Sequence, residues 1–115
     1  PICDLTLSNS YGGGEGTAQN PFRVCNLAQW NYLASTATDW SKNFKLESDI
    51  DFTGIDPSTF LSVGNGTTAF TGTFDGNSYA LKNLNLLAGT TSLAFFNTTD
   101  SGATFKNLKL KNNQL

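Results

Sequence analysis

Carboxylates are concentrated in one short stretch of the sequence. Residues 44–52 read Phe-Lys-Leu-Glu-Ser-Asp-Ile-Asp-Phe, in which apolar and charged side chains largely alternate. This alternation predicts a β-strand with one wet face, from which Asp49 and Asp51 project side by side, roughly 7 Å apart. Two carboxylates on one face can contribute to a calcium site or to the acid and base pair of a glycosidase.

The same carboxylates have a simpler interpretation. Calcium takes about six to eight oxygen ligands, so Asp75 or Asp56 would have to join Asp49 and Asp51 from a neighbouring segment. An acidic row on a wet strand face also discourages edge-to-edge pairing between molecules. We therefore predict a solvated acidic face, with calcium binding as the weaker alternative, and no cofactor.

The composition argues against catalysis. The chain contains no histidine, which removes the commonest general base and the commonest metal ligand together. Some β-helix enzymes cleave acidic polysaccharides with Asp, Lys and Arg on a sheet face, but this chain has a single arginine, Arg23, in an early strand. We expect no enzyme activity, and keep a fragment of a polysaccharide-acting β-helix enzyme as a minor alternative.

The overall charge narrows the classes of partner. The net charge is −2, so there is no basic field to hold nucleic acid or anionic lipid. No apolar run approaches the ~20 residues that a membrane span needs. Charged residues make up only 14% of the chain, and the abundance of Asn, Thr, Ser and Gly suits strands joined by tight turns.

The two cysteines, Cys3 and Cys25, predict a disulfide that ties an N-terminal arm to the first strand. Closing a loop of that length stabilises a fold by ~3 kcal/mol in the chain-entropy model. A disulfide implies export to an oxidising compartment, hence a secreted or cell-surface protein. The alternative is a pair of unrelated thiols in a reduced cytosolic protein.

The elements that position these residues are predicted from a repeat. The segments 81–86 and 105–110 share an apolar residue, then Lys-Asn, then Leu-x-Leu. Strand-like alternation that recurs over the interval from residue 81 to residue 105 predicts a parallel β-solenoid. A leucine-rich-repeat-like solenoid is the alternative. We expect Leu84 and Leu108 to lie directly over one another, and Asn83 and Asn107 to be left-handed at coil corners. The repeat positions are Leu81, Asn83, Leu84, Leu86, Phe105, Asn107, Leu108 and Leu110.

The chain is predicted to form one mostly-β domain over residues 1–115. An N-terminal arm and a flexible Gly-rich loop (1–21) precede the first strand and a capping helix (22–43), and the coils follow (44–115). Asn26 is the expected N-cap of the helix, which spans about 27–35 and covers the open end of the first coil with Trp30 in the core. Because the sequence ends at Leu115 directly after a strand, we expect further coils or a sister subunit to cover that end.

The order of motifs along the chain resembles a known family. It is similar to the GLUG-type right-handed β-helix domain of bacterial surface proteins and adhesins, which also occurs in some immunoglobulin-A-cleaving peptidases. The resemblance implies an exported bacterial domain with no catalytic residues, although Ser78-Tyr79 replace the Gly-His common in the family. The matching segments are residues 14–24, 44–46, 49–52, 63–64, 70–77, 81–84 and 103–108.

The expected function is non-enzymatic adhesion, through binding of a surface glycan or a host protein. Trp40, Tyr79 and Tyr11 are the aromatic side chains that we predict to be exposed and to contact the ligand. Ordinary partial burial of these rings is the alternative. The competing function is that of a structural spacer or cap within a larger surface protein, whose partners are neighbouring coils or sister subunits.

Overall fold

The fold consists mostly of short strands, as predicted. The computed structural model describes residues 3, 10–55, 60–65, 67–84, 95–96 and 99–111. Between the first two strands lie the helix α1 (Leu27–Ser35) and a single turn of 3-10 helix (Ala37–Asp39). The strands are β1 (Phe22–Val24), β2 (Asn43–Leu46), β3 (Ile50–Asp51), β4 (Thr73–Asp75), β5 (Ala80–Lys82), β6 (Thr104–Lys106) and β7 (Lys109–Lys111).

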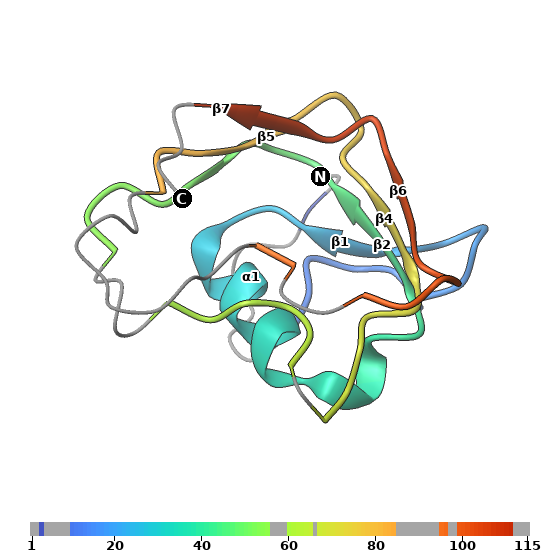
Figure 1. Cartoon of the computed structure of the whole chain (residues 1–115). Coiled ribbons are helices and arrows are strands. Elements are labelled where there is room, and N and C mark those ends of the chain that lie inside the picture. Colours follow the sequence, from blue (N-terminus) through green and yellow to red (C-terminus); the bar gives the residue numbers. More distant parts are fainter. Residues whose placement is uncertain are drawn as a thin grey trace.

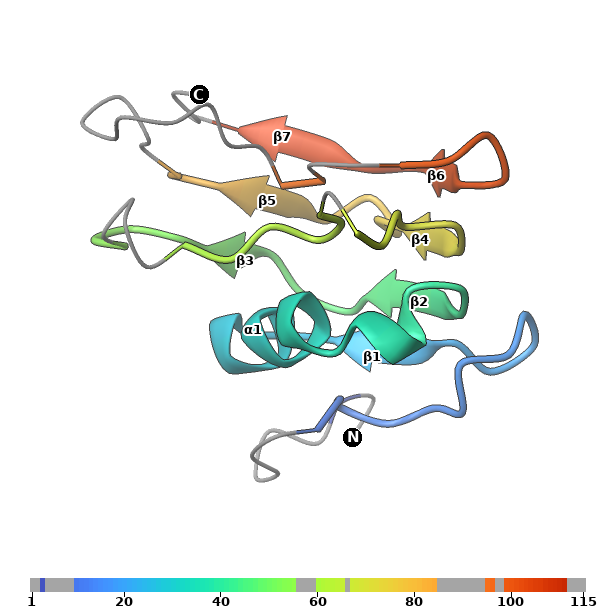
Figure 2. The same cartoon turned by 60° about the horizontal axis from the view of Figure 1, so that its bottom comes forward.

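The strands form two parallel sheets that the chain visits in alternation. One sheet has the order β1-β2-β4-β6, the other the order β3-β5-β7, and each pair of neighbours is parallel. Figure 1 shows the sheets meeting at an angle, with α1 closing the space between them. Figure 2 shows the strands stacked one level upon the next. This arrangement is compatible with a β-helix-like fold.

The register of the strands differs from the predicted repeat. Phe44 pairs with Phe74, and Phe74 pairs with Phe105. In the other sheet, Leu81 pairs with Leu110. The predicted repeat would instead place Leu81 opposite Phe105. The predicted interval between successive coils is therefore too short, and that prediction is wrong.

The two copies of the Lys-Asn-Leu motif lie in different places for this reason. The first begins in β5, whereas the second begins in β6 of the other sheet and ends in β7. Leu84 follows Leu81 by three positions, whereas Leu108 precedes Leu110 by two, so Leu84 and Leu108 are not opposite each other. Leu86 lies outside the described residues. Similar motifs therefore occur on different sheets.

Aromatic side chains fill the space between the sheets. Trp30 of α1 is fully buried, as predicted. Its ring meets those of Phe52 and Phe74 edge-on, with centroids 5.7 and 6.3 Å apart. Full burial of each such side chain stabilises a fold by roughly 1.5–3 kcal/mol, so these rings fix where α1 lies against the strands.

Helix α1 begins as predicted but occupies a different place. The Asn26 side chain accepts a hydrogen bond from the Gln29 backbone N–H at 2.9 Å, which caps the helix. Figure 2 shows α1 alongside the first levels of strands rather than across their end. The prediction that it covers the open end is wrong, because Trp30 contacts residues of several successive levels.

The segment after the N-terminal arm lies beyond β1 instead. Backbone hydrogen bonds join Gly12 N–H to the Arg23 carbonyl at 2.7 Å and Arg23 N–H to the Gly13 carbonyl at 2.9 Å. Cys3 and Cys25 form the predicted disulfide next to this segment, with their Cα atoms 6.5 Å apart. Within the described part of the chain, no helix is long and apolar enough to cross a membrane.

The corners between strands contain asparagines with positive φ, as predicted. Asn83 and Asn107 have φ of 65° and 54°. Their side-chain amides reach an adjacent turn, where they donate to the carboxylates of Asp51 at 3.0 Å and Asp75 at 3.4 Å. The amides thus link turns as expected, but their acceptors are carboxylates rather than other amides. A Cβ at Gly76 would come within 2.4 Å of the Leu108 Cα, so this corner requires glycine.

Candidate functional site

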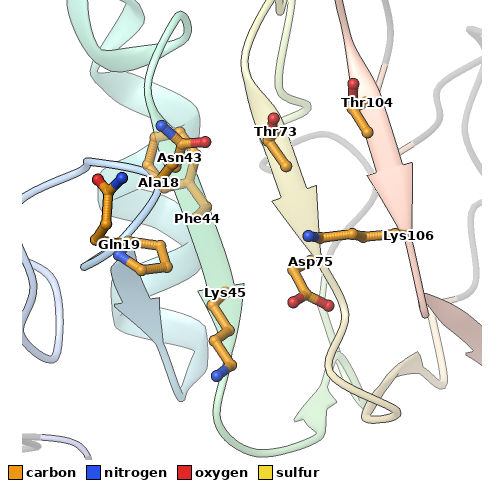
Figure 3. Close-up of a pocket in the computed structure, with 10 residues that line it drawn as sticks. Ala18, Gln19, Asn43, Phe44, Lys45, Thr73, Asp75, Thr104 and Lys106 are labelled. Atoms are coloured by element: carbon orange, nitrogen blue, oxygen red, sulfur yellow. The ribbon is translucent and has the colours of Figure 1, made fainter.

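A groove of about 360 Å³ lies on the outer face of β2, β4 and β6 (Figure 3). The alternation of side chains along each strand places Phe44, Phe74 and Phe105 in the pairing row between the outward residues. The residues that line the groove are Ala18, Gln19, Pro21, Asn43, Phe44, Lys45, Thr73, Asp75, Thr104 and Lys106. We call this surface the sheet groove.

Six polar side chains form two rows across the sheet groove. Because the strands are in register, Asn43, Thr73 and Thr104 form one row, and Lys45, Asp75 and Lys106 form the other. Figure 3 shows the two rows at opposite ends of the strand segments. Neighbouring strands lie ~4.8 Å apart, and alternate positions along a strand are separated by ~7 Å, so the rows run parallel at a fixed spacing.

The glycine-rich loop forms one wall of the sheet groove through Ala18, Gln19 and Pro21. The loop folds back on itself, because the backbone N–H groups of Glu15 and Gly16 both donate to the Asn20 carbonyl. It is attached to β2 by Asn43, whose backbone N–H and side-chain amide both donate to the Gly16 carbonyl, at 2.9 and 3.0 Å. The predicted flexible turn therefore has a fixed place beside the sheet.

The charged row alternates in sign. Lys45 lies 4.0 Å from Glu47, which is not among the residues that line the groove. The Asp75 carboxylate accepts hydrogen bonds from the Asn77 backbone N–H at 2.8 Å and from the Asn107 side chain at 3.4 Å, which orient it. Lys106 extends from β6 toward β4 (Figure 3). The groove thus presents a cation, an anion and a cation on successive strands.

This set of groups suits the binding of a polyhydroxylated molecule. Hydroxyl, amide, ammonium and carboxylate groups together offer both hydrogen-bond donors and acceptors. Asp75 is the one carboxylate among the lining residues. The described residues contain no group of three or more His, Cys, Asp or Glu side chains that could hold a metal ion.

Two of the three aromatic residues predicted to contact a ligand are buried. Trp40 is 2% exposed, and its indole N–H donates to the Leu33 carbonyl of α1 at 2.8 Å. Its polar sequence neighbours lie at the surface while its ring packs under the helix, so the predicted exposure is wrong.

Tyr11 is 5% exposed and stacks on Phe22 with ring centroids 4.3 Å apart. Its hydroxyl donates to Asp39 at 2.9 Å. Burial, aided by the hydrogen bond to Asp39 and by its charge, raises the pKa of Tyr11 above its ordinary value. The predicted exposure of Tyr11 is wrong too, although it borders a smaller hollow of about 220 Å³ beside Gly13 and Gly14.

Tyr79 is 38% exposed, so its predicted exposure is confirmed. It lies at the corner between β4 and β5 and is not among the residues that line the sheet groove. Its contact with a ligand stays a prediction.

Asp49 and Asp51 connect neighbouring turns. Asp49 accepts a hydrogen bond from the Ala80 backbone N–H at 2.8 Å and lies 3.7 Å from the Lys82 ammonium. Hydrogen bonds from Thr53 and from the Asn83 side chain lower the pKa of Asp51 to about 2. Both carboxylates therefore have structural partners. The strand predicted over residues 44–52 is divided, because β2 ends at Leu46 and β3 begins at Ile50 in the other sheet, so Asp49 lies between the two strands.

The comparisons with known proteins give two partial similarities. The chain is 28% identical to halomucin of Haloquadratum walsbyi over 119 aligned positions, which cover 95% of the chain and 1% of halomucin. In a solved structure of a "putative immunoglobulin A1 protease" from Bacteroides ovatus, the matching region is 31% identical with a TM-score of 0.52. It covers 65% of this chain and 22% of that one. No protein-family model matches the chain.

The sequence reasoning missed the sheet groove, although a signal for it exists. A triplet of a polar residue, phenylalanine and a charged residue occurs at residues 43–45, 73–75 and 104–106, which are the residues paired in β2, β4 and β6. The positions of this triplet give the register that the Lys-Asn-Leu motif does not. The outer residues of the triplets are the two rows of the groove.

Proposed function

We propose that this chain is a non-enzymatic extracellular binding domain whose sheet groove holds a glycan. The observation that carries the proposal is the pair of polar rows held in register on three parallel strands. The similarity to halomucin and the disulfide between Cys3 and Cys25 support an exported or surface protein. Its attachment to a bacterial surface stays a prediction.

The spacing of the sheet groove favours a linear glycan. Adjacent strands are ~4.8 Å apart, which is close to the length of one sugar unit in an extended chain. Successive sugar units lying across the strands would meet equivalent side chains on successive strands. The hydroxyls of Thr73 and Thr104 and the carboxylate of Asp75 are suited to hydrogen bonds with sugar hydroxyls.

The groove also supports binding without hydrolysis. Glycosidases commonly use a pair of carboxyl groups on either side of the scissile bond. Asp75 is the only carboxylate among the described lining residues, and one of its oxygens already accepts hydrogen bonds from the Asn77 N–H and the Asn107 amide.

We further propose that the two sheets are faces of a right-handed parallel β-solenoid of the GLUG type. From β2 onward, paired strands follow one another at nearly constant intervals in both sheets, which supports one coil per interval with two sheets per turn, whereas the step from β1 to β2 is shorter. Crossover connections between parallel strands are right-handed in about 98% of cases. The likeness to the Bacteroides ovatus structure supports a shared fold over 65% of this chain. Two sheets per turn disfavour the leucine-rich-repeat alternative.

The proposed function is tested by binding to a panel of immobilised glycans. Thr104 is exposed on β6 within the groove, so Thr104→Trp fills the groove with little effect on the fold. The matched control is Thr67→Trp, at an exposed position that does not line the groove. We expect Thr104→Trp to weaken glycan binding at least tenfold and Thr67→Trp to leave it unchanged. Equal binding by the two variants, or binding of no glycan by the unaltered chain, would overturn the proposal.

A second candidate function, that of a structural spacer, is favoured by the β6–β7 edge. Phe105 and Leu110 are 39% and 56% exposed, whereas their neighbours Phe74 and Leu81 in the adjacent strands are fully buried. A neighbouring turn or a sister subunit would cover this apolar edge. Solution mass distinguishes the cases, since a dimer or trimer that dissociates when Leu110 is replaced by Asp supports coverage by a subunit.

A further inference from the structure

The charged row of the sheet groove places side chains of alternating charge on adjacent strands. Lys45, Asp75 and Lys106 occupy the same register on three adjacent strands. The backbone positions of the two lysines are two strand spacings apart, about 9–10 Å, with that of Asp75 midway between them, and the Lys106 side chain extends toward β4 (Figure 3). Arg23 precedes Lys45 in the same row on β1. The row therefore favours anions, although the chain as a whole carries a net charge of −2.

This spacing distinguishes between patterns of charge on a linear glycan. If one sugar unit lies over each strand, an acidic group on every second unit meets Lys45 and Lys106, while a neutral unit lies over Asp75. A glycan with an acidic group on every unit would place a carboxylate against the Asp75 carboxylate, which repels it. A neutral glycan would offer no anion to either ammonium group, and Lys45 would keep only its contact with Glu47 at 4.0 Å.

We propose that the sheet groove selects an acidic glycan in which uronate units alternate with neutral units. This inference rests on the proposed glycan-binding function and names its substrate class. The glycan lies across β2, β4 and β6, with its carboxylates at Lys45 and Lys106. Hydroxyls on its other edge contact the neutral row of Asn43, Thr73 and Thr104.

Three soluble probes test the charge pattern. Hyaluronan oligosaccharides alternate glucuronate with N-acetylglucosamine, oligogalacturonates carry an acid on every unit, and cello-oligosaccharides are neutral. Titration calorimetry at pH 7 and low salt should give the tightest binding for hyaluronan oligosaccharides, at least tenfold tighter than for the other two. The advantage should shrink as salt is added, because exposed charges are screened.

Charge-matched variants locate the effect. Lys45→Gln with Lys106→Gln should lower hyaluronan affinity at least tenfold and remove most of its salt dependence. Lys109→Gln with Lys111→Gln removes the same charge from β7, in the other sheet, and should leave the affinity within about twofold. Asp75→Asn keeps an oxygen acceptor for the Asn77 N–H and should bring oligogalacturonate binding close to that of hyaluronan.

The outcomes separate the two proposals. Equal losses in the two lysine pairs would mean that net charge alone attracts the polymer, and would overturn the selection of alternating uronates. Tighter binding of cello-oligosaccharides than of hyaluronan, with loss on Thr104→Trp, would overturn this inference and leave glycan binding in the groove intact. Binding of none of the probes or panel glycans would overturn both.

Discussion

Single side chains at the corners hold successive turns in place. Asp51 and Asp75 each accept a hydrogen bond from a nearby backbone N–H, of Thr53 and Asn77 respectively. Each also accepts one from an asparagine side chain of the following turn, Asn83 or Asn107. A carboxylate that accepts several hydrogen bonds favours its charged form. These aspartates therefore join their own turns to the next.

Asp51 gives a prediction for pH dependence. Its pKa in the folded protein is about 2, below the ~3.9 of an unperturbed aspartate. Its contribution to stability is therefore complete above about pH 4 and is lost as the pH falls toward 2. NMR titration of the Asp51 carboxyl carbon should show a midpoint near 2, and Thr53→Ala should raise it while Thr67→Ala does not. A midpoint near 4 in the unaltered chain would contradict the corner hydrogen bonds.

The left-handed corner residues give a second prediction. Asn107 has φ of 54°, where a Cβ costs roughly 1–2 kcal/mol for most residues. Asn107→Ala should therefore lower the free energy of unfolding by about 1–2 kcal/mol, whereas Asn107→Gly should lower it less. Urea denaturation compares the two variants. Equal losses for the two variants would mean that the hydrogen bond to Asp75, which both variants remove, dominates over the backbone conformation at this corner.

At the scale of the elements, α1 depends on a local cap as well as on its buried face. Replacing the N-cap Asn26 by Ala should lower the free energy of unfolding by about 1 kcal/mol, because the Gln29 N–H loses its acceptor. Asn26→Asp retains an acceptor oxygen and should have little effect. Thermal denaturation of both variants checks this, and equal stabilities would show that the cap contributes nothing.

The elements also show what the sequence can predict. The sequence places helix α1 at its observed bounds because the cap and the helical spacing are local signals. It predicts the disulfide and the left-handed asparagines for similar reasons. Strand register depends instead on pairing between segments far apart in the chain, and the similar Lys-Asn-Leu motifs suggest a false interval. The burial of Trp40 depends on its packing under α1, which its polar neighbours conceal.

The sequence alone does not reveal the candidate site, because the site also depends on strand register. None of the six polar residues in its two rows is unusual by itself, and their alignment exists only once three strands are in register. The prediction of ligand contacts depends instead on three single aromatic residues. Of Trp40, Tyr79 and Tyr11, only Tyr79 is exposed.

At the scale of the whole molecule, the paired phenylalanines of β2, β4 and β6 predict that a substitution costs less stability at the β6 edge than in the interior. Phe74 is fully buried between neighbouring levels, whereas Phe105 in the adjacent strand β6 is 39% exposed. Phe74→Ala should therefore cost about 3–5 kcal/mol of unfolding free energy, and Phe105→Ala clearly less. Chemical denaturation measures both. Similar losses would mean that the β6 edge is covered in solution, as the spacer function requires.

The central claim is that Lys45, Asp75 and Lys106 share one row because β2, β4 and β6 are paired in the register that aligns Phe44, Phe74 and Phe105. Nuclear Overhauser contacts between backbone protons across the strands test it most directly. The account predicts contacts between Asp75 and Lys106 and between Leu81 and Leu110. Contacts between Leu81 and Phe105, which stacking of the two Lys-Asn-Leu copies would require, would contradict the register and with it the sheet groove.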